Sequence, residues 1–188
     1  MRRFDEANSA DPNEVDFEGR RWPKELLYAR WLSDWVERLE PNASEALRLA
    51  ARCQHICRWE IPRESYPATR EGYLQWRARL KQLHAEKSEA ILREAGYEDA
   101  MAHRVRDLNL KKNIKTDPEC QVLEDALCLI FLERQLDELS ERSEEPKLIN
   151  ALRKSWAKMS ERGRQTALTL NLPPSAKELV RKALTPDA

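Results

Sequence analysis

The chain has 188 residues, of which 35% are charged and 41% hydrophobic, and only four are glycine. This composition is typical of a helical globular protein, and the length suits one domain with a sizeable core. The 33 basic and 33 acidic side chains cancel. No overall positive field therefore favours nucleic acid or an anionic membrane surface, and we expect neither as a partner.

No segment has the pattern of a secretion signal or of a membrane span. The start, Met1–Glu6, runs directly into acidic residues, and the longest apolar run, Ala126–Leu132, is far shorter than the ~20 residues that a membrane helix needs. The cysteines lie inside helical patterns and lack the spacing of a zinc motif or a disulfide framework. We therefore expect a protein of the reducing cytoplasm. The cysteines are Cys53, Cys57, Cys120 and Cys128.

Prolines, glycines and capping residues divide the chain into helices, and no strand alternation is visible. The sequence predicts an all-α, single-domain helical bundle. An N-terminal arm over 1–22 precedes core helices over 23–140, which carry the site, and packing helices over 141–188. The predicted helices cover about residues 3–9, 23–40, 44–59, 69–95 and 98–112, one beginning at 118, and 145–160, 163–170 and 175–184.

The segment Arg52–Arg63 is the most informative part of the sequence for function. At helical spacing, Arg48, Arg52, His55 and Trp59 share one face beside the core stripe. Guanidinium groups offer forked donors to phosphate or carboxylate, and an indole ring offers a stacking surface. The pattern predicts an anion-binding site. The expected substrate-binding residues are Arg52, Arg58, Trp59, Arg63, Arg77 and Lys112.

Each candidate residue also has a plain structural interpretation. His55 is either a functional group or a helix histidine bonded to an acid, and its arginine neighbours favour function. His84 lies beside an apolar stripe and is equally well a core-edge residue, whereas His103 is expected at the surface. Lys112 lies at a basic helix end, where lysines complement the helix dipole.

Asp125 lies on a helix that becomes apolar on all sides one turn later. An ionised carboxylate in such surroundings is costly unless an arginine or a metal ion compensates its charge. Both the structural and the functional interpretation therefore predict a positive partner for Asp125.

The order of these elements resembles the HD superfamily of metal-dependent phosphohydrolases, a helical fold that holds metal ions with histidines and aspartates. His55 lies where the His-Asp histidine would be, and Leu123–Ala126 resembles the segment with the final aspartate. Two positions depart from that pattern, because Ile56 replaces the paired aspartate and Tyr28 stands near the place of the first histidine. The resemblance implies an HD-like arrangement of helices and a site with fewer metal ligands.

A closer resemblance covers nearly the whole chain. Its matching segments are Phe4–Asn8 with Asp11-Pro12, Pro23–Ala29, Gln54–Trp59 and Leu123–Ala126. In these segments the chain resembles domain-of-unknown-function family 4202, which occurs in bacteria and fungi. That family implies no activity.

Three hypotheses about function follow. The first is a divergent HD-like phosphohydrolase for a phosphorylated small molecule or nucleotide, with His55 and Asp125 as catalytic residues. His55, His84 and Asp125 would hold one divalent transition metal (zinc, manganese or iron), which activates water and polarises the phosphoryl group. The second is a non-catalytic module that binds an anionic, phosphate-bearing molecule. The third is a helical scaffold for a protein partner. Substrate and oligomeric state stay open.

Overall fold

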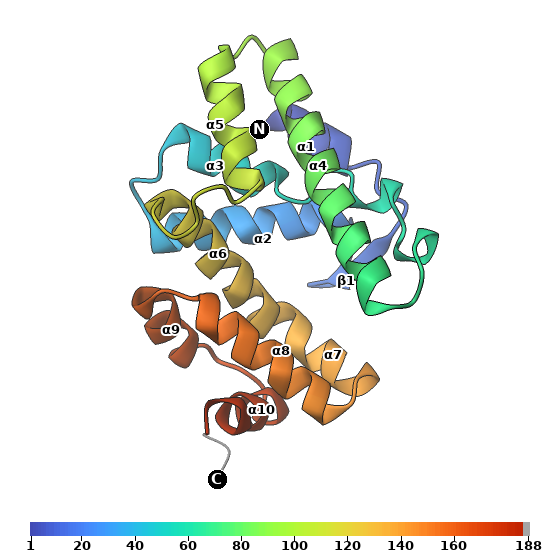
Figure 1. The fold of residues 1–188 in the computed structure, drawn as a ribbon, viewed down its shortest axis with the longest axis vertical. Coiled ribbons are helices and arrows are strands. Elements are labelled where there is room, and N and C mark those ends of the chain that lie inside the picture. Colours follow the sequence, from blue (N-terminus) through green and yellow to red (C-terminus); the bar gives the residue numbers. More distant parts are fainter. Residues whose placement is uncertain (186–188) are drawn as a thin grey trace. The chain divides into compact units, whose positions relative to one another are not determined.

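The structure is a computed structural model that describes residues 1–185 (Figure 1). The chain divides into two compact units, the first formed by residues 1–120 and the second beginning at Gln121. Most of the described residues are helical, which confirms the all-α prediction. Within residues 1–185, no helix combines the length and the apolar character required to cross a bilayer.

The first unit is built from five helices that belong to it alone, two short 3-10 turns and one hairpin. Their limits agree with most of the predicted helices to within a few residues. The elements are α1 (Arg2–Asn8), β1 (Glu14–Phe17), β2 (Arg20–Pro23), α2 (Lys24–Leu39), α3 (Glu45–Cys53), η1 (Arg58–Glu60), η2 (Arg63–Ser65), α4 (Arg70–Glu94) and α5 (Asp99–Asn109), followed by the start of α6 (Pro118–Ile130).

The β1–β2 hairpin is a feature that the sequence pattern did not predict. Its strands pair antiparallel, with Val15 opposite Trp22, and Glu18 and Gly19 both adopt positive φ at the turn. Two positive-φ residues are the geometry that a tight hairpin requires. The strands are short and highly charged, so their alternation was too weak to recognise in the sequence. The hairpin docks through Phe17, whose ring meets that of Trp31 edge-on at 5.2 Å.

Helix α3 ends earlier than the sequence predicted. It begins at the capping residue Ser44, whose Oγ accepts from the Leu47 N–H, but it stops at Cys53 instead of continuing to Trp59. Cys57 adopts φ +54°, in the left-handed region, and its N–H donates to Asn8 Oδ1 at 3.0 Å. The predicted continuous face from Arg48 to Trp59 therefore does not exist.

Helices α4 and α5 form an antiparallel pair in the first unit (Figure 1). Thr69 caps α4 by accepting from the Gly72 N–H, and Gly96 at φ +85° ends it, as the sequence predicted. Large buried side chains from α1 to α5 fill the core of this unit. They include Phe4, Leu32, Leu47, Leu49, Ile56, Leu92 and Leu108.

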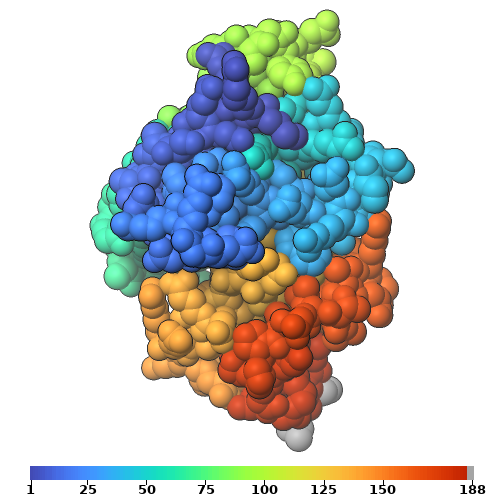
Figure 2. Space-filling model, turned by 180° about the vertical axis from the view of Figure 1, so that it is seen from behind, coloured from blue at the N-terminus to red at the C-terminus, as the bar shows by residue number. Residues whose placement is uncertain are grey.

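The outer face of the first unit drawn in Figure 2 is formed by the N-terminal segment, the hairpin and α2. Three side chains of α1 and the turn after it form hydrogen bonds to later segments of the first unit. Asp5 pairs with Arg52 of α3, Asn8 holds Cys57, and Asp11 Oδ2 accepts from the Glu25 N–H at 2.9 Å. The predicted N-terminal arm is therefore an integral part of the fold.

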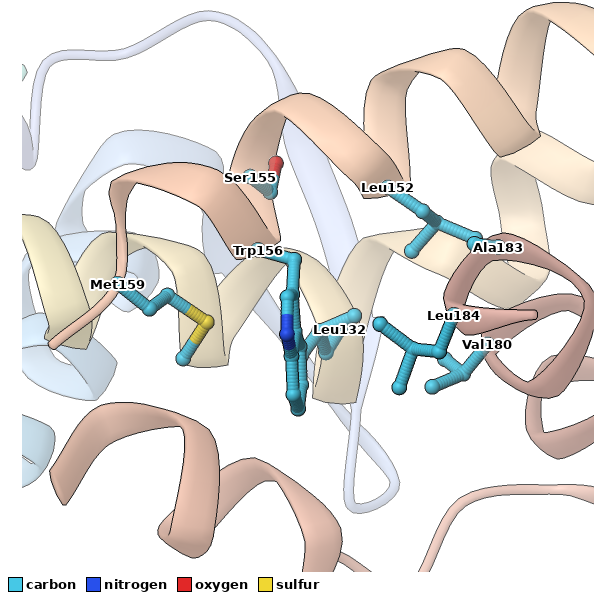
Figure 3. Close-up of a pocket in the computed structure, with 8 residues that line it drawn as sticks. All are labelled: Leu132, Leu152, Ser155, Trp156, Met159, Val180, Ala183 and Leu184. Atoms are coloured by element: carbon cyan, nitrogen blue, oxygen red, sulfur yellow. The ribbon is translucent and has the colours of Figure 1, made fainter. Parts of the chain in front are cut away.

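The second unit is a smaller set of helices. Its elements are the main part of α6, the π-helical turn η3 (Phe131–Gln135), α7 (Leu136–Arg142), α8 (Glu145–Lys158), α9 (Glu161–Leu168) and α10 (Pro174–Leu184). Figure 3 shows the side chains around a small void in this unit. Its volume is about 10 Å³, enough for only one water molecule. Most of the side chains that line it are apolar, so we regard it as a packing defect. The lining residues are Leu132, Leu152, Ser155, Trp156, Met159, Val180, Ala183 and Leu184.

Candidate functional site

Three rings from separate elements of the first unit meet at His55. Tyr28 of α2 stacks on His55, with ring centroids 4.6 Å apart and planes inclined by 26°. The ring of His84, from α4, lies 5.7 Å from that of His55. His84 and Tyr28 are buried, whereas the His55 side chain keeps 23% of its surface exposed. The two histidines that the sequence predicted to act together are thus neighbours, and Tyr28 joins them.

His84 is held in one tautomer by the backbone. Its Nδ1 lies 2.8 Å from the carbonyl oxygen of Ile56. A carbonyl can only accept, so Nδ1 carries the proton and Nε2 carries a lone pair. Burial lowers the pKa of His84 to about 4, which keeps the ring neutral at pH 7. Nε2 is buried and has no hydrogen-bond partner within residues 1–185.

Glu25 brings a buried carboxylate to the same place. It lies in the first turn of α2 and is only 6% exposed. Its Oε2 is 3.8 Å from His55 Nδ1, and its Oε1 is 3.8 Å from Arg58 Nε. Burial raises the pKa of Glu25 to about 7, although the positive charge of Arg58 opposes the shift. Among the described residues, Oε2 has no hydrogen-bond donor.

Positive charges surround His55. Burial is the main cause that lowers its pKa well below the ordinary value, and the charges of Arg58, Lys111 and Arg77 lower it further. Arg58 stacks on the Trp76 ring at 4.9 Å and is about one-third exposed. His55 is therefore a neutral imidazole in an electropositive setting, as a site for an anion requires.

Four predicted substrate-binding residues have other roles or positions. Arg52 forms a two-point ion pair with Asp5, at 2.6 and 2.8 Å, so its guanidinium is committed to joining α1 and α3. Arg63 donates to the carbonyl oxygens of Tyr66 and Pro67, at 2.9 and 2.8 Å, and so holds the loop before α4.

Lys112 and Trp59 are the other two. Lys112, exposed just beyond the end of α5, pairs with Asp107 at 2.7 Å. Trp59 lies in η1 and is half-buried, and the ring against which Arg58 stacks is that of Trp76. Of the six predicted substrate-binding residues, Arg58 and Arg77 remain close enough to influence the charge of His55.

Asp125 lies in the second unit and serves its architecture. Oδ1 accepts from Gln121 Nε2 at 3.0 Å and from the Ser160 N–H at 2.8 Å, and Oδ2 accepts from Ser160 Oγ. Ser160 is the capping residue of α9. The sequence predicted a positive partner for Asp125, whereas the donors in these bonds are neutral groups, and the positive end of the α9 dipole compensates the carboxylate.

Gly163 makes this arrangement possible. A Cβ atom added at Gly163 would lie 2.6 Å from Asp125 Cγ, closer than any normal contact. The glycine near the start of α9 therefore leaves the space that the carboxylate occupies.

The described residues do not form a metal site with three side-chain ligands. Within residues 1–185, no three histidine, cysteine, aspartate or glutamate side chains are placed to hold one ion. His55 and His84 supply two neighbouring imidazoles, and the oxygens of Asp125 already accept three hydrogen bonds in the other unit.

Glu25 is the site residue that sequence analysis missed. Its signal was present, because Glu25, Tyr28 and Leu32 fall at i, i+3 and i+7 on the buried face of α2. A charged residue on an apolar stripe is the same pattern that singled out Asp125. The sequence alone did not show which of the two acids would find donors.

Comparison with known proteins identifies one family. The family model described as "Domain of unknown function (DUF4202)" matches residues 1–180. No curated protein matches the chain. No solved structure matches it either, so the HD-like arrangement of helices has no support from a structural relative.

Proposed function

Since the chain belongs to the DUF4202 family, whose function is unknown, its activity must be inferred from its site, and we propose that the first unit binds a small phosphate-bearing anion at His55. One observation carries this proposal. Glu25 Oε2 and His84 Nε2, two buried acceptor atoms without donors among residues 1–185, flank a partly exposed imidazole that has cations near it. Buried polar atoms are normally paired, so unpaired ones around an accessible group favour a ligand-binding site.

The electrostatics favour an anion over a neutral molecule. Arg58 can donate a planar fork of N–H groups, as phosphate recognition commonly uses. Arg77 and Lys111 add positive charge near His55. Glu25 is the buried acid that faces His55 and Arg58, with the buried Asp11 next to it. Burial raises the pKa of Glu25 to about 7, so it repels an anion less than an ordinary glutamate would.

The test is thermal unfolding with sulfate or inorganic phosphate against chloride at equal ionic strength. A ligand that binds only the folded state raises the Tm by mass action, here by roughly 2–4 °C for a millimolar Kd. Arg58→Ala and Arg77→Ala should each reduce that rise. An equal rise with chloride would overturn the proposal.

Two control variants separate the site from general charge effects. Arg79, also exposed on α4, pairs with Glu86 at 3.4 Å, so Arg79→Ala should retain the phosphate response of the wild type. Arg52→Ala should lower the Tm without phosphate, since the Asp5 pair is lost, but it should retain the rise on adding phosphate. Loss of the response in the Arg79 variant would show that bulk charge, and not this site, attracts phosphate.

Hydrolysis of a bound phosphate ester is the second candidate function, and the tautomer of His84 favours it. Histidines that bind metals usually donate their other ring N–H to a carbonyl or carboxylate, as His84 does to Ile56. A zinc–nitrogen bond is ~2.0–2.1 Å long, so rings whose centroids are 5.7 Å apart are within reach of one ion. His55 and His84 would hold it, with Glu25 beside them, and a bound divalent metal supplies an activated water.

Metal analysis of protein purified without a histidine tag tests this candidate. We expect up to one zinc, manganese or iron ion per chain, lost in His84→Ala, and release of phosphate from a phosphomonoester. His103, an exposed histidine that faces Glu89, provides the matched control, because His103→Ala should leave the metal content unchanged. Absence of both metal and phosphate release, with phosphate binding intact, would leave the non-catalytic binding module.

A further inference from the structure

We propose that the anion bound at His55 is a phosphorylated polyol, whose hydroxyl groups donate to Glu25 Oε2 and His84 Nε2. This inference rests on the proposed phosphate site and specifies its ligand class. The phosphoryl group alone does not account for the site, because the dianion of a phosphate monoester offers only acceptors. His84 Nε2 and, in the ionised form of Glu25, Oε2 are acceptors as well, so they need a ligand group that donates.

Of the two acceptors, His84 Nε2 places the stronger constraint on the ligand. Its lone pair is fixed because Nδ1 donates to the Ile56 carbonyl, and the ring cannot turn without breaking that bond. The residue is 4% exposed, so an unpaired Nε2 loses its water without compensation. Leaving such an acceptor unsatisfied is costly, and a hydroxyl donor would recover that cost.

Glu25 Oε2 is the second acceptor beside His55. It lies 3.8 Å from His55 Nδ1, too far for a hydrogen bond. Its other oxygen faces Arg58, also at 3.8 Å. The carboxylate is therefore near both neighbours but bonded to neither, and either of its oxygens can accept from a ligand hydroxyl.

A comparison inside the same unit shows why these two atoms point to a ligand. Asn109 Oδ1 is also without a donor within residues 1–185. However, Asn109 is anchored through Nδ2 to Cys53 Sγ and Ser88 Oγ, at 3.2 and 3.3 Å, and all three residues are almost completely buried. Glu25 and His84 instead contact His55, which is open to solvent. Among the described residues, the environment of Glu25 and His84 combines unpaired acceptors, an accessible ring and positive charge.

The experiment compares two phosphate esters that differ only in their hydroxyl groups. Glycerol 3-phosphate and n-propyl phosphate carry the same anion on chains of the same length. Calorimetric titration of the full chain should give glycerol 3-phosphate a Kd about tenfold lower, since one additional hydrogen bond to a buried acceptor is worth about that factor. Inorganic phosphate serves as the third probe.

Variants then assign the preference to the proposed acceptors. His84→Phe and Glu25→Met each remove one acceptor and should each bring the ratio of the two Kd values closer to one. His103→Phe, at the exposed histidine of α5, should keep the wild-type ratio. Two variants are used because His84→Phe also breaks the bond to Ile56, and if it fails to fold, Glu25→Met and the wild-type ratio still decide.

The outcomes separate this inference from the proposed function. Equal binding of both esters by the wild type would overturn the polyol inference, and water would then be the donor to the two acceptors, while the phosphate site would stand. No binding of any of the three probes would overturn both. A wild-type preference that persists in both variants would overturn the assignment to Glu25 and His84.

Discussion

Two buried carboxylates, Glu25 in the first unit and Asp125 in the second, have the same kind of sequence environment but differ in their hydrogen-bond donors. Each lies on the apolar side of a helix and is 6% or less exposed. Asp125 accepts hydrogen bonds at both oxygens, from Gln121 and Ser160. Glu25 has an oxygen with no donor among the described residues. The difference separates a structural acid from a candidate site residue.

The physical reason is what the neighbouring backbone provides. Asp125 faces the start of α9, where free N–H groups and the helix dipole stabilise a negative charge. Glu25 instead faces imidazole and guanidinium groups at 3.8 Å, beyond hydrogen-bond distance. Burial alone therefore does not identify a functional acid. What identifies it is whether hydrogen-bond donors face its oxygens.

The largest expected effect comes from Asp125→Ala. The variant leaves Ser160 and Gln121 without their acceptor, and hydrogen bonds to charged groups contribute about 1.5–3 kcal/mol each. Since such losses are not additive, we expect the free energy of unfolding of the second unit to fall by roughly 4 kcal/mol, measured by urea denaturation.

Glu138→Ala is the matched control for Asp125→Ala. Its carboxylate pairs with Arg142 on the exposed surface of α7, so the change should stay within about 0.5 kcal/mol. A similarly small loss in Asp125→Ala would break the comparison, because Asp125 would then not be the structural acid of the second unit.

Glu25→Gln should change how stability depends on pH. The pKa of Glu25 rises from 4.5 to about 7 on folding, so the folded state favours the protonated acid. Its contribution to stability is fully present below pH 4.5 and is lost as the pH rises through 7. The variant should therefore gain stability over the wild type between these values, by up to roughly 3 kcal/mol.

Denaturant unfolding at pH 4.5 and at pH 8 measures the Glu25 effect. The lowered pKa of His84 acts in the opposite sense, since its contribution is lost as the pH falls from 6.5 to about 4. It is present in both proteins, so the difference between variant and wild type isolates Glu25. Parallel pH profiles would mean that donors satisfy Glu25 as fully as they satisfy Asp125.

Gly163→Ala tests whether the Asp125 carboxylate needs the space beside Gly163. Alanine usually stabilises a helix relative to glycine by about 1 kcal/mol, but here its Cβ would overlap the Asp125 carboxylate. We expect a net loss of about 2 kcal/mol. In the Asp125→Ala background the overlap disappears and the substitution should become neutral or stabilising. A double-mutant cycle measures this coupling, and additive effects would contradict it.

Asn8→Ala gives the smallest expected effect and probes the support of the site. Asn8 Oδ1 accepts from the Cys57 N–H, which holds the left-handed turn two residues after His55. Its loss should cost about 1–2 kcal/mol and should also weaken phosphate binding at His55. Glu6→Ala on the exposed side of α1 is the control, and equal phosphate affinities in the two variants would show that the turn holds without Asn8.

The sequence predicted most helices because local signals define them. Thr69 and Ser44 cap helices where expected, and Gly96 ends α4 at positive φ. The end of α3 was wrong, because the bond from the Cys57 N–H to Asn8 joins residues 49 positions apart. No local pattern contains such a contact.

The candidate site divides in the same way. The sequence by itself singled out His55, His84, Arg58 and Arg77 and identified the family. Only the tertiary structure decided that Arg52 pairs with Asp5, that Asp125 accepts hydrogen bonds from the start of α9, and that Glu25 lies beside His55. Residue type determines what a side chain can donate or accept, whereas its actual partner depends on which distant segments the fold brings within about 3 Å.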